Sequence, residues 1–150
     1  MRKFLLFTLI AISIAFCSWT NDTLNANSWC MRVGQNELLA SWKNNQMGDT
    51  VLFDKTKFKS TDTLFAERYL CGFIRQPAVT TVTIKNQQNQ IIKQVVSKGT
   101  QLGMTGYIPL SEIIILNGYK SGQTLGVFLT IDFKNKDFNE TVLLGRLKIK

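Results

Sequence analysis

The chain contains no histidine, only three cysteines and two prolines, and no glycine-rich phosphate loop. Without histidine, the Ser–His–Asp and Cys–His nucleophilic machineries and the histidine-containing zinc sites are excluded. Neither a Gly-x-Gly-x-x-Gly nor a Gly-Lys-Ser/Thr pattern occurs, so nucleotide binding has no signature here. We therefore expect no cofactor and no metal centre, and we do not expect an enzyme.

Carboxylates are the remaining groups that could carry catalysis, because two of them alone can hydrolyse a glycosidic bond. The acidic residues are scattered over turns and strand ends, where they serve as caps or as solvated charges. Glu67 is the exception, since it lies in an otherwise apolar segment beside Arg68. The two could form a buried ion pair or part of a pocket, but the outward face of a strand is the commoner position for such a side chain. No spacing singles out a pair, so a glycoside hydrolase ranks third among the functions considered.

Long hydrophobic runs are also scarce. The run at residues 4–16 (FLLFTLIAISIAF) follows the basic start of residues 1–3 (MRK). It is shorter than the roughly 20 residues that span a bilayer, and a basic start before an apolar run is typical of a secretory signal peptide. We therefore predict that residues 1–17 are a signal peptide and that the protein is secreted or periplasmic.

The end of this signal is open to more than one interpretation. Small residues favour cleavage before Phe16 or before Ser18. Residues 14–17 (IAFC) also resemble a bacterial lipobox, although that motif has a small residue where Phe16 stands. In the second interpretation Cys17 carries a lipid and anchors the protein to the membrane. No other membrane contact is expected.

The two remaining cysteines, Cys30 and Cys71, form an even pair once Cys17 is removed or lipidated. An exported protein meets an oxidising compartment, which permits a disulfide bond between them. The alternative is two buried free thiols, which are common as small core residues. We predict the disulfide.

The formal charge is +8, from 18 basic and 10 acidic residues. The lysines are scattered, and export makes nucleic acid an unsuitable partner, so none is expected. Lys55, Lys57 and Lys59 alternate, so an extended chain would place them on one face, where they could bind an anionic glycan, a lipid headgroup or an acidic protein. Their alternative role is to protect a sheet edge from aggregation.

The clearest structural signal is residues 124–133 (TLGVFLTIDF), in which apolar and polar residues alternate. This period of two is typical of a half-buried β-strand. Phe128 is the single apolar residue on the polar face, so it is a candidate contact residue. A loop and a closing strand at residues 141–150 complete a predicted hairpin, with Leu143 and Gly145 on one face of that strand.

Further strands are predicted at residues 28–33, 49–53, 63–73, 80–85 and 90–97, with a hairpin joining the last two and a short helix near residues 111–116. We predict an all-β fold: an antiparallel β-sandwich, Ig-like or jelly-roll-like, with at most one short helix. It forms a single domain over residues 28–150, after a flexible polar lead at residues 18–27.

Aromatic residues in or beside loops suggest binding, because exposed rings can stack on sugars; these are Trp42, Tyr107 and Tyr119. Filling the core is the alternative role for each of them. The predicted function is therefore a non-catalytic exported module that binds a protein or a glycan in the envelope. A small-ligand or lipid carrier built as a β-barrel is the alternative. The sequence does not indicate an oligomeric state.

Overall fold

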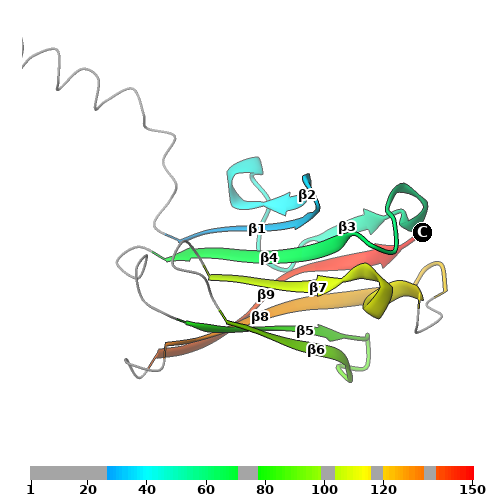
Figure 1. Ribbon diagram of the computed structural model, residues 1–150. Helices are drawn as coiled ribbons and strands as arrows, with labels where there is room; N and C mark the ends of the chain where they lie inside the picture. Colours follow the sequence, from blue (N-terminus) through cyan, green and yellow to red (C-terminus); the bar gives the residue numbers. More distant parts are fainter. Residues whose placement is uncertain (1–26, 71–77, 99–103, 116–119, 134–137) are drawn as a thin grey trace, which may run out of the picture.

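The computed structural model shows two β-sheets packed face to face (Figure 1). It describes residues 27–70, 78–98, 104–115, 120–133 and 138–150. The first sheet contains, in spatial order, β2 (Asn36–Ala40), β1 (Asn27–Val33), β4 (Thr63–Leu70) and β7 (Met104–Pro109). The second contains β3 (Thr50–Phe53), β9 (Phe138–Ile149), β8 (Thr124–Phe133), β5 (Val79–Lys85) and β6 (Ile91–Lys98).

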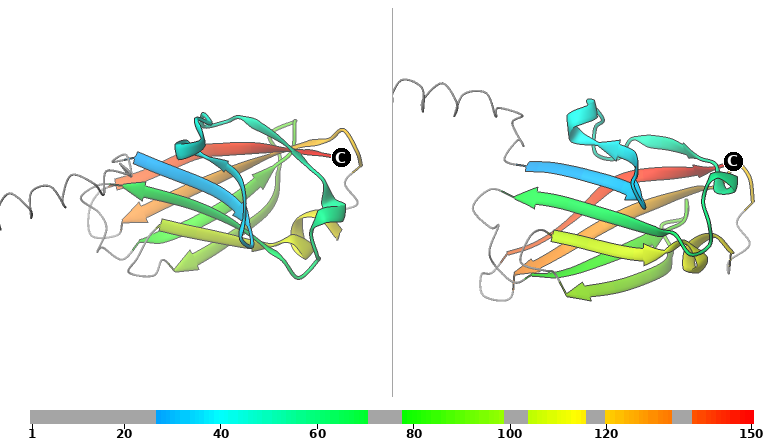
Figure 2. Two further views of the ribbon diagram at one scale, coloured as in Figure 1. Left: turned by 90° about the horizontal axis from the view of Figure 1, so that it is seen from above. Right: turned by 45° about the horizontal axis from the view of Figure 1, so that its top comes forward.

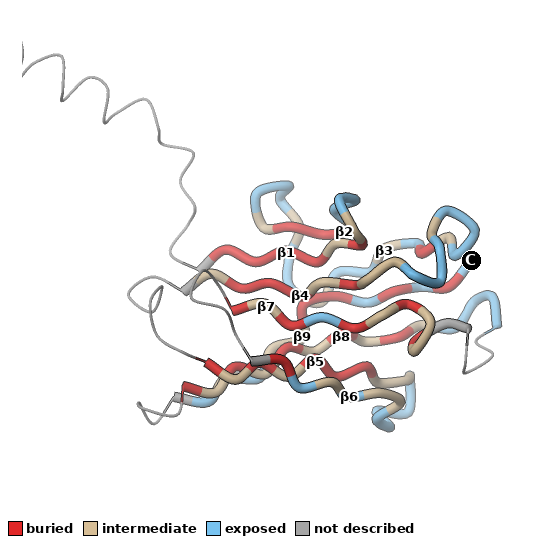
Figure 3. The backbone as a smooth tube through the Cα atoms, in the orientation of Figure 1, coloured by how far each residue is buried: buried red, intermediate tan, exposed pale blue. Residues whose placement is uncertain are grey.

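The core lies between the sheets, because one face of each strand is apolar. Figure 3 shows buried positions recurring along the strands, and in β8 every second residue is buried. The core contains fully buried residues with large side chains from both sheets. These are Met31, Phe53, Leu64, Ile84, Ile108, Ile113, Leu125, Leu129, Ile131, Phe133, Leu144 and Leu147. The predicted all-β sandwich is therefore confirmed.

The predicted hairpin of β8 and β9 is present, but one of its faces was assigned wrongly. The register shifts by one residue between Val127 and Phe128, so that Val127 pairs with Gly145 and Phe128 pairs with Leu143. Leu144 is the extra residue of this β-bulge, and it is fully buried. Leu143 and Gly145 consequently lie on opposite faces of β9, whereas the alternation had predicted one shared face.

A second departure is the direction of β3, which pairs with β9 in parallel. All other strand pairs are antiparallel, as predicted. The chain leaves β2 in one sheet and enters β3 in the other, and Figure 2 shows this crossing over the side of the sandwich. The parallel partners β3 and β9 are connected through β4 to β8, which is far more chain than the crossover that a parallel pair requires.

Three short helical turns join the strands: η1 (Ser41–Lys43), η2 (Lys55–Lys57) and the π-helical turn η3 (Ser111–Ile115). The last confirms the short helix predicted near residue 111. Asp54 begins η2 by accepting hydrogen bonds from Thr56, and these bonds together with that from Lys150 lower the pKa of Asp54 to about 2. The lysines at 55–59 therefore do not form an extended row, and that prediction was wrong.

Glu67 and Arg68 point to opposite faces of β4, so they do not pair with each other. On the outer face, Glu67 accepts from Arg32 at 2.8 Å. On the inner face, Arg68 reaches across the sandwich to Glu140 of β9, also at 2.8 Å. In the part of the chain that the structure describes, no helix is long and apolar enough to cross a membrane. The predicted signal peptide and most of the lead lie outside the described residues.

Candidate functional site

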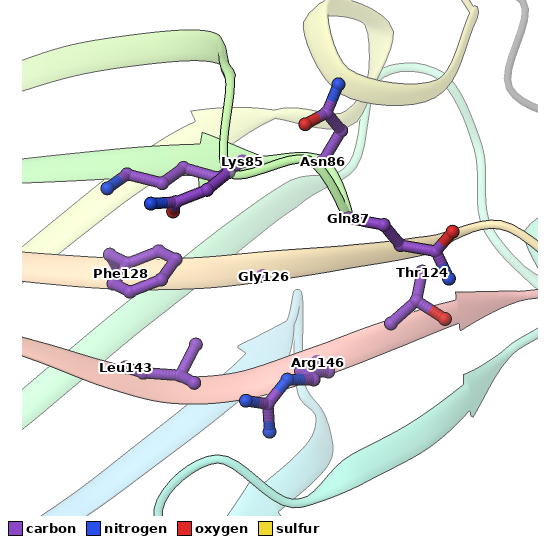
Figure 4. Close-up of a pocket in the computed structure, with 9 residues that line it drawn as sticks. Lys85, Asn86, Gln87, Thr124, Gly126, Phe128, Leu143 and Arg146 are labelled. Carbon is purple, nitrogen blue, oxygen red and sulfur yellow. The ribbon is translucent and has the colours of Figure 1, made fainter.

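The outer face of the second sheet has a gap at Gly126. In the strand register, Gly126 of β8 lies between Lys85 of β5 and Arg146 of β9. Residues that pair across adjacent strands present their side chains on the same face. Lys85 and Arg146 therefore flank a position that carries no side chain, as Figure 4 shows.

The next row across the sheet closes one side of this gap. Phe128 pairs with Thr83 on one side and with Leu143 on the other. A Cβ atom built on Gly126 would lie 2.9 Å from Cε2 of Phe128 and 3.5 Å from Cδ1 of Leu143. The ring and the leucine thus lean over the glycine, in a close contact that the absence of a Cβ atom permits.

These residues enclose an open pocket of about 190 Å³. Its lining combines two cations, three amides, a hydroxyl and an apolar floor: Lys85, Asn86, Gln87, Asn89, Thr124, Gly126, Phe128, Leu143 and Arg146. Figure 4 shows Lys85 and Phe128 on one side of Gly126, with Gln87 and Thr124 on the other. An apolar floor with a few polar groups directed at it is typical of a ligand site.

The two cations of the pocket are held in place by the fold. The Lys85 ammonium lies 4.7 Å from the centroid of the Phe128 ring, in a cation–π contact. The Arg146 guanidinium donates through Nη1 to the carbonyl oxygen of Gly48, and its backbone N–H donates to Asp49 O at 2.7 Å. The connection between β2 and β3 therefore fixes the orientation of this arginine.

The amides of the pocket come from the turn between β5 and β6. The Asn86 side chain closes this turn, because its Oδ1 accepts from Gln90 N at 2.9 Å and its Nδ2 donates to Gln90 Oε1 at 2.8 Å. Neither Gln87 nor Asn89 uses its side-chain amide in a hydrogen bond to another described residue. Both amides are thus free to donate to a ligand and to accept from it.

The outer face of the first sheet differs because its charges are paired. Arg32 stacks on Phe65 at 4.1 Å and pairs with Glu67, and this hydrogen bond raises the pKa of Arg32. Burial and the nearby Glu67 raise the pKa of Tyr69, whose hydroxyl donates to that carboxylate at 3.4 Å. Burial is also the main cause that raises the pKa of the Cys30 thiol to about 12.

The residues predicted to bind do not gather at one place. Trp42 on η1 and Tyr107 on β7 are 47% and 48% exposed, but they belong to opposite edges of the first sheet. Lys55, Lys57 and Lys59 lie on and after η2. Of the predicted binding residues that the structure describes, only Phe128 lines the pocket.

Three of the predicted residues lie outside the described parts of the chain: Cys17, Cys71 and Tyr119. Cys30 is buried and forms no disulfide bond with another described residue. The disulfide between Cys30 and Cys71 stays a prediction.

Sequence reasoning missed most of the pocket, including both of its cations. Gly126 and Phe128 could have been singled out, because a glycine and an aromatic residue break the polar face of the same strand. Arg146 could not, since its position beside Gly126 depends on the register of β9. In the ranges that the structure describes, no group of three or more histidine, cysteine, aspartate or glutamate side chains could hold a metal ion.

Comparison of the chain with protein-family models, with curated proteins and with solved structures finds no match. The geometry offers an open pocket whose described lining combines cations, amides, a hydroxyl and apolar side chains. These groups can hold a polar ligand.

Proposed function

We propose that this protein is a non-catalytic binding module, exported to the envelope or the medium, and that its ligand is a glycan held in the pocket over Gly126. The observation that carries this proposal is the gap in the sheet at Gly126, bordered by Phe128. The face of an aromatic ring can stack on the apolar face of a sugar ring. The amides of Gln87 and Asn89 and the hydroxyl of Thr124 suit its hydroxyl groups.

A surface site also distinguishes this function from a carrier. A carrier holds its ligand in an enclosed apolar cavity, whereas this pocket opens onto the outer face of a sheet and is lined by polar as well as apolar groups. The space between the two sheets is occupied by the side chains of the core. The geometry therefore favours a ligand bound at the surface.

The test is a glycan array probed with the purified protein and with a Gly126→Val variant. Valine suits a strand and faces outward here, so the variant keeps its fold while its side chain fills the pocket. Thr81→Val is the matched control, because Thr81 lies on the outer face of β5 and outside the pocket. We expect binding by the parent and the control, and loss of binding by Gly126→Val.

Equal binding by Gly126→Val and the parent would show that the pocket is not the site. The glycan function itself would be contradicted if the protein binds no glycan but captures a defined envelope protein, and if Gly126→Val still binds that protein. Melting temperatures measured on all three proteins exclude unfolding as the cause of any loss.

A further inference from the structure

The pocket carries a net positive charge. Five ion pairs occur among the described residues: Arg32–Glu67, Lys43–Glu37, Arg68–Glu140, Lys93–Glu112 and Lys150–Asp54. None of them involves Lys85 or Arg146. The described lining of the pocket therefore holds two positive charges and no carboxylate, and what distinguishes these two cations from the other unpaired lysines is that they share one pocket.

The spacing of the two cations suits a single anionic group. Lys85 and Arg146 are the cross-strand neighbours of Gly126 on either side. Adjacent strands lie about 4.8 Å apart, so the Cα atoms of the two cations lie about 10 Å apart across the glycine. Their long side chains rise on the same face, above a position without a side chain. The Lys85 ammonium lies over the Phe128 ring and the Arg146 guanidinium contacts Gly48, so both side chains would turn toward the pocket to donate to one oxyanion there.

Both cations keep donors available for such a group. Arg146 uses Nη1 to bind Gly48 O, and the remaining guanidinium N–H groups are not bonded to other described residues. Lys85 contacts the ring of Phe128, which leaves its ammonium hydrogens for a ligand. Lys148 adds a third positive charge, because it pairs with Thr124 and lies exposed at the border of the pocket.

We infer that the ligand is an acidic glycan, whose carboxylate, sulfate or phosphate group lies over Gly126 between Lys85 and Arg146. This inference rests on the proposed glycan-binding function and adds the charge of the ligand to it. Phe128 contacts the sugar ring that carries the anionic group. The turn amides of Gln87 and Asn89 bind the hydroxyl groups of the same or the adjacent unit.

The experiment compares oligosaccharides that differ only in charge: uronate oligomers against their carboxyl-reduced forms, and sulfated oligomers against their desulfated forms. Binding is measured by calorimetry at low and at high salt. The proteins are the parent, Lys85→Gln, Arg146→Gln and Lys57→Gln. The last is the charge-matched control, because Lys57 lies on η2 and outside the pocket.

We expect the acidic member of a pair to bind about tenfold more tightly than its neutral form. Charge-assisted hydrogen bonds at a partly solvated site provide a gain in affinity of about this size. High salt should reduce this difference. Lys85→Gln and Arg146→Gln should each weaken acidic binding by about fivefold to tenfold and reduce the difference in affinity between the acidic and the neutral members. Lys57→Gln should change neither.

Equal affinity for charged and neutral members would overturn the inference and leave the glycan function standing. An equal loss in Lys57→Gln would also overturn it, because the preference would then come from the overall charge. Binding of vesicles containing phosphatidylglycerol, with no binding of any oligosaccharide, would contradict the glycan function and the inference together. Binding of inorganic phosphate alone would have the same meaning.

Discussion

Gly106 of β7 marks the closest approach of the two sheets, so Gly106→Ala should destabilise the protein. A Cβ atom built on Gly106 would lie 2.2 Å from Cγ2 of Val82 and 3.2 Å from Cδ1 of Leu129. Carbon atoms pack at about 3.5 Å or more, so Val82 would have to move by about 1.3 Å. Val82 is fully buried and β-branched, and it has no free rotamer to take.

Overpacking of this kind costs about 1–3 kcal/mol in the free energy of unfolding. For a domain of this size, such a loss lowers the melting temperature by about 4–12 °C. Gly126→Ala is the matched control, because its new Cβ meets the edge of the Phe128 ring on the outer face, and that ring can move. We expect the control to stay within about 1 kcal/mol of the parent, the range of a glycine-to-alanine change at an unstrained position.

The assay is urea unfolding followed by tryptophan fluorescence, since Trp29 is buried in the core. A Gly106→Ala protein that unfolds with the midpoint and slope of the parent would refute the close approach of the sheets. The double variant Gly106→Ala/Val82→Ala makes the test specific. If Val82 is the obstacle, the two changes together cost less than the sum of their separate effects.

Four further predictions follow from the buried groups and the N-terminus. A charge placed at the fully buried Leu129, as in Leu129→Asp, should unfold the domain, as measured by the loss of a cooperative melting transition. Because the pKa of Cys30 is raised from 9.0 to about 12, the unfolded chain loses this proton first as the pH rises. Stability should therefore fall above pH 9 by up to about 1.4 kcal/mol per pH unit, and Cys30→Ala should remove that part of the slope. Arg68→Met, which leaves Glu140 without its partner, should cost about 3 kcal/mol, whereas Arg68→Met/Glu140→Leu should recover much of the loss. Mass spectrometry should find a mature chain beginning at residue 16 or 18; a diacylglycerol on Cys17 would instead establish the lipoprotein.

The sheets could be predicted because they depend on local alternation. The inner face predicted for the strand around Val82 and Ile84 is buried, and Trp29, Met31 and Val33 of β1 are buried as well. Each of these strands shows its period of two in the sequence, and burial of one face follows from it.

The pocket could not be predicted, because it depends on register between distant strands. Lys85, Gly126 and Arg146 come from three strands, and only the pairing of β5, β8 and β9 brings them together. The sequence pattern does not predict the bulge at Leu144 either, since alternation alone places Leu143 and Gly145 on one face. The prediction of an extended row for the three lysines at 55–59 was wrong for a different reason. Asp54 caps a helical turn there, where alternation suggested an extended chain.

The position of β9 has a consequence for how the chain acquires its structure. This strand follows all the other described strands in the sequence, yet it lies between β3 and β8 and pairs with both. Thr50 pairs with Arg146, and the Lys150 N–H donates to Phe53 O, so β3 finds its partner only far along the chain. Pairing over such sequence distances is slow, so we expect this edge of the second sheet to form late in folding. Arg146 consequently takes its place beside Gly126 only when β9 docks.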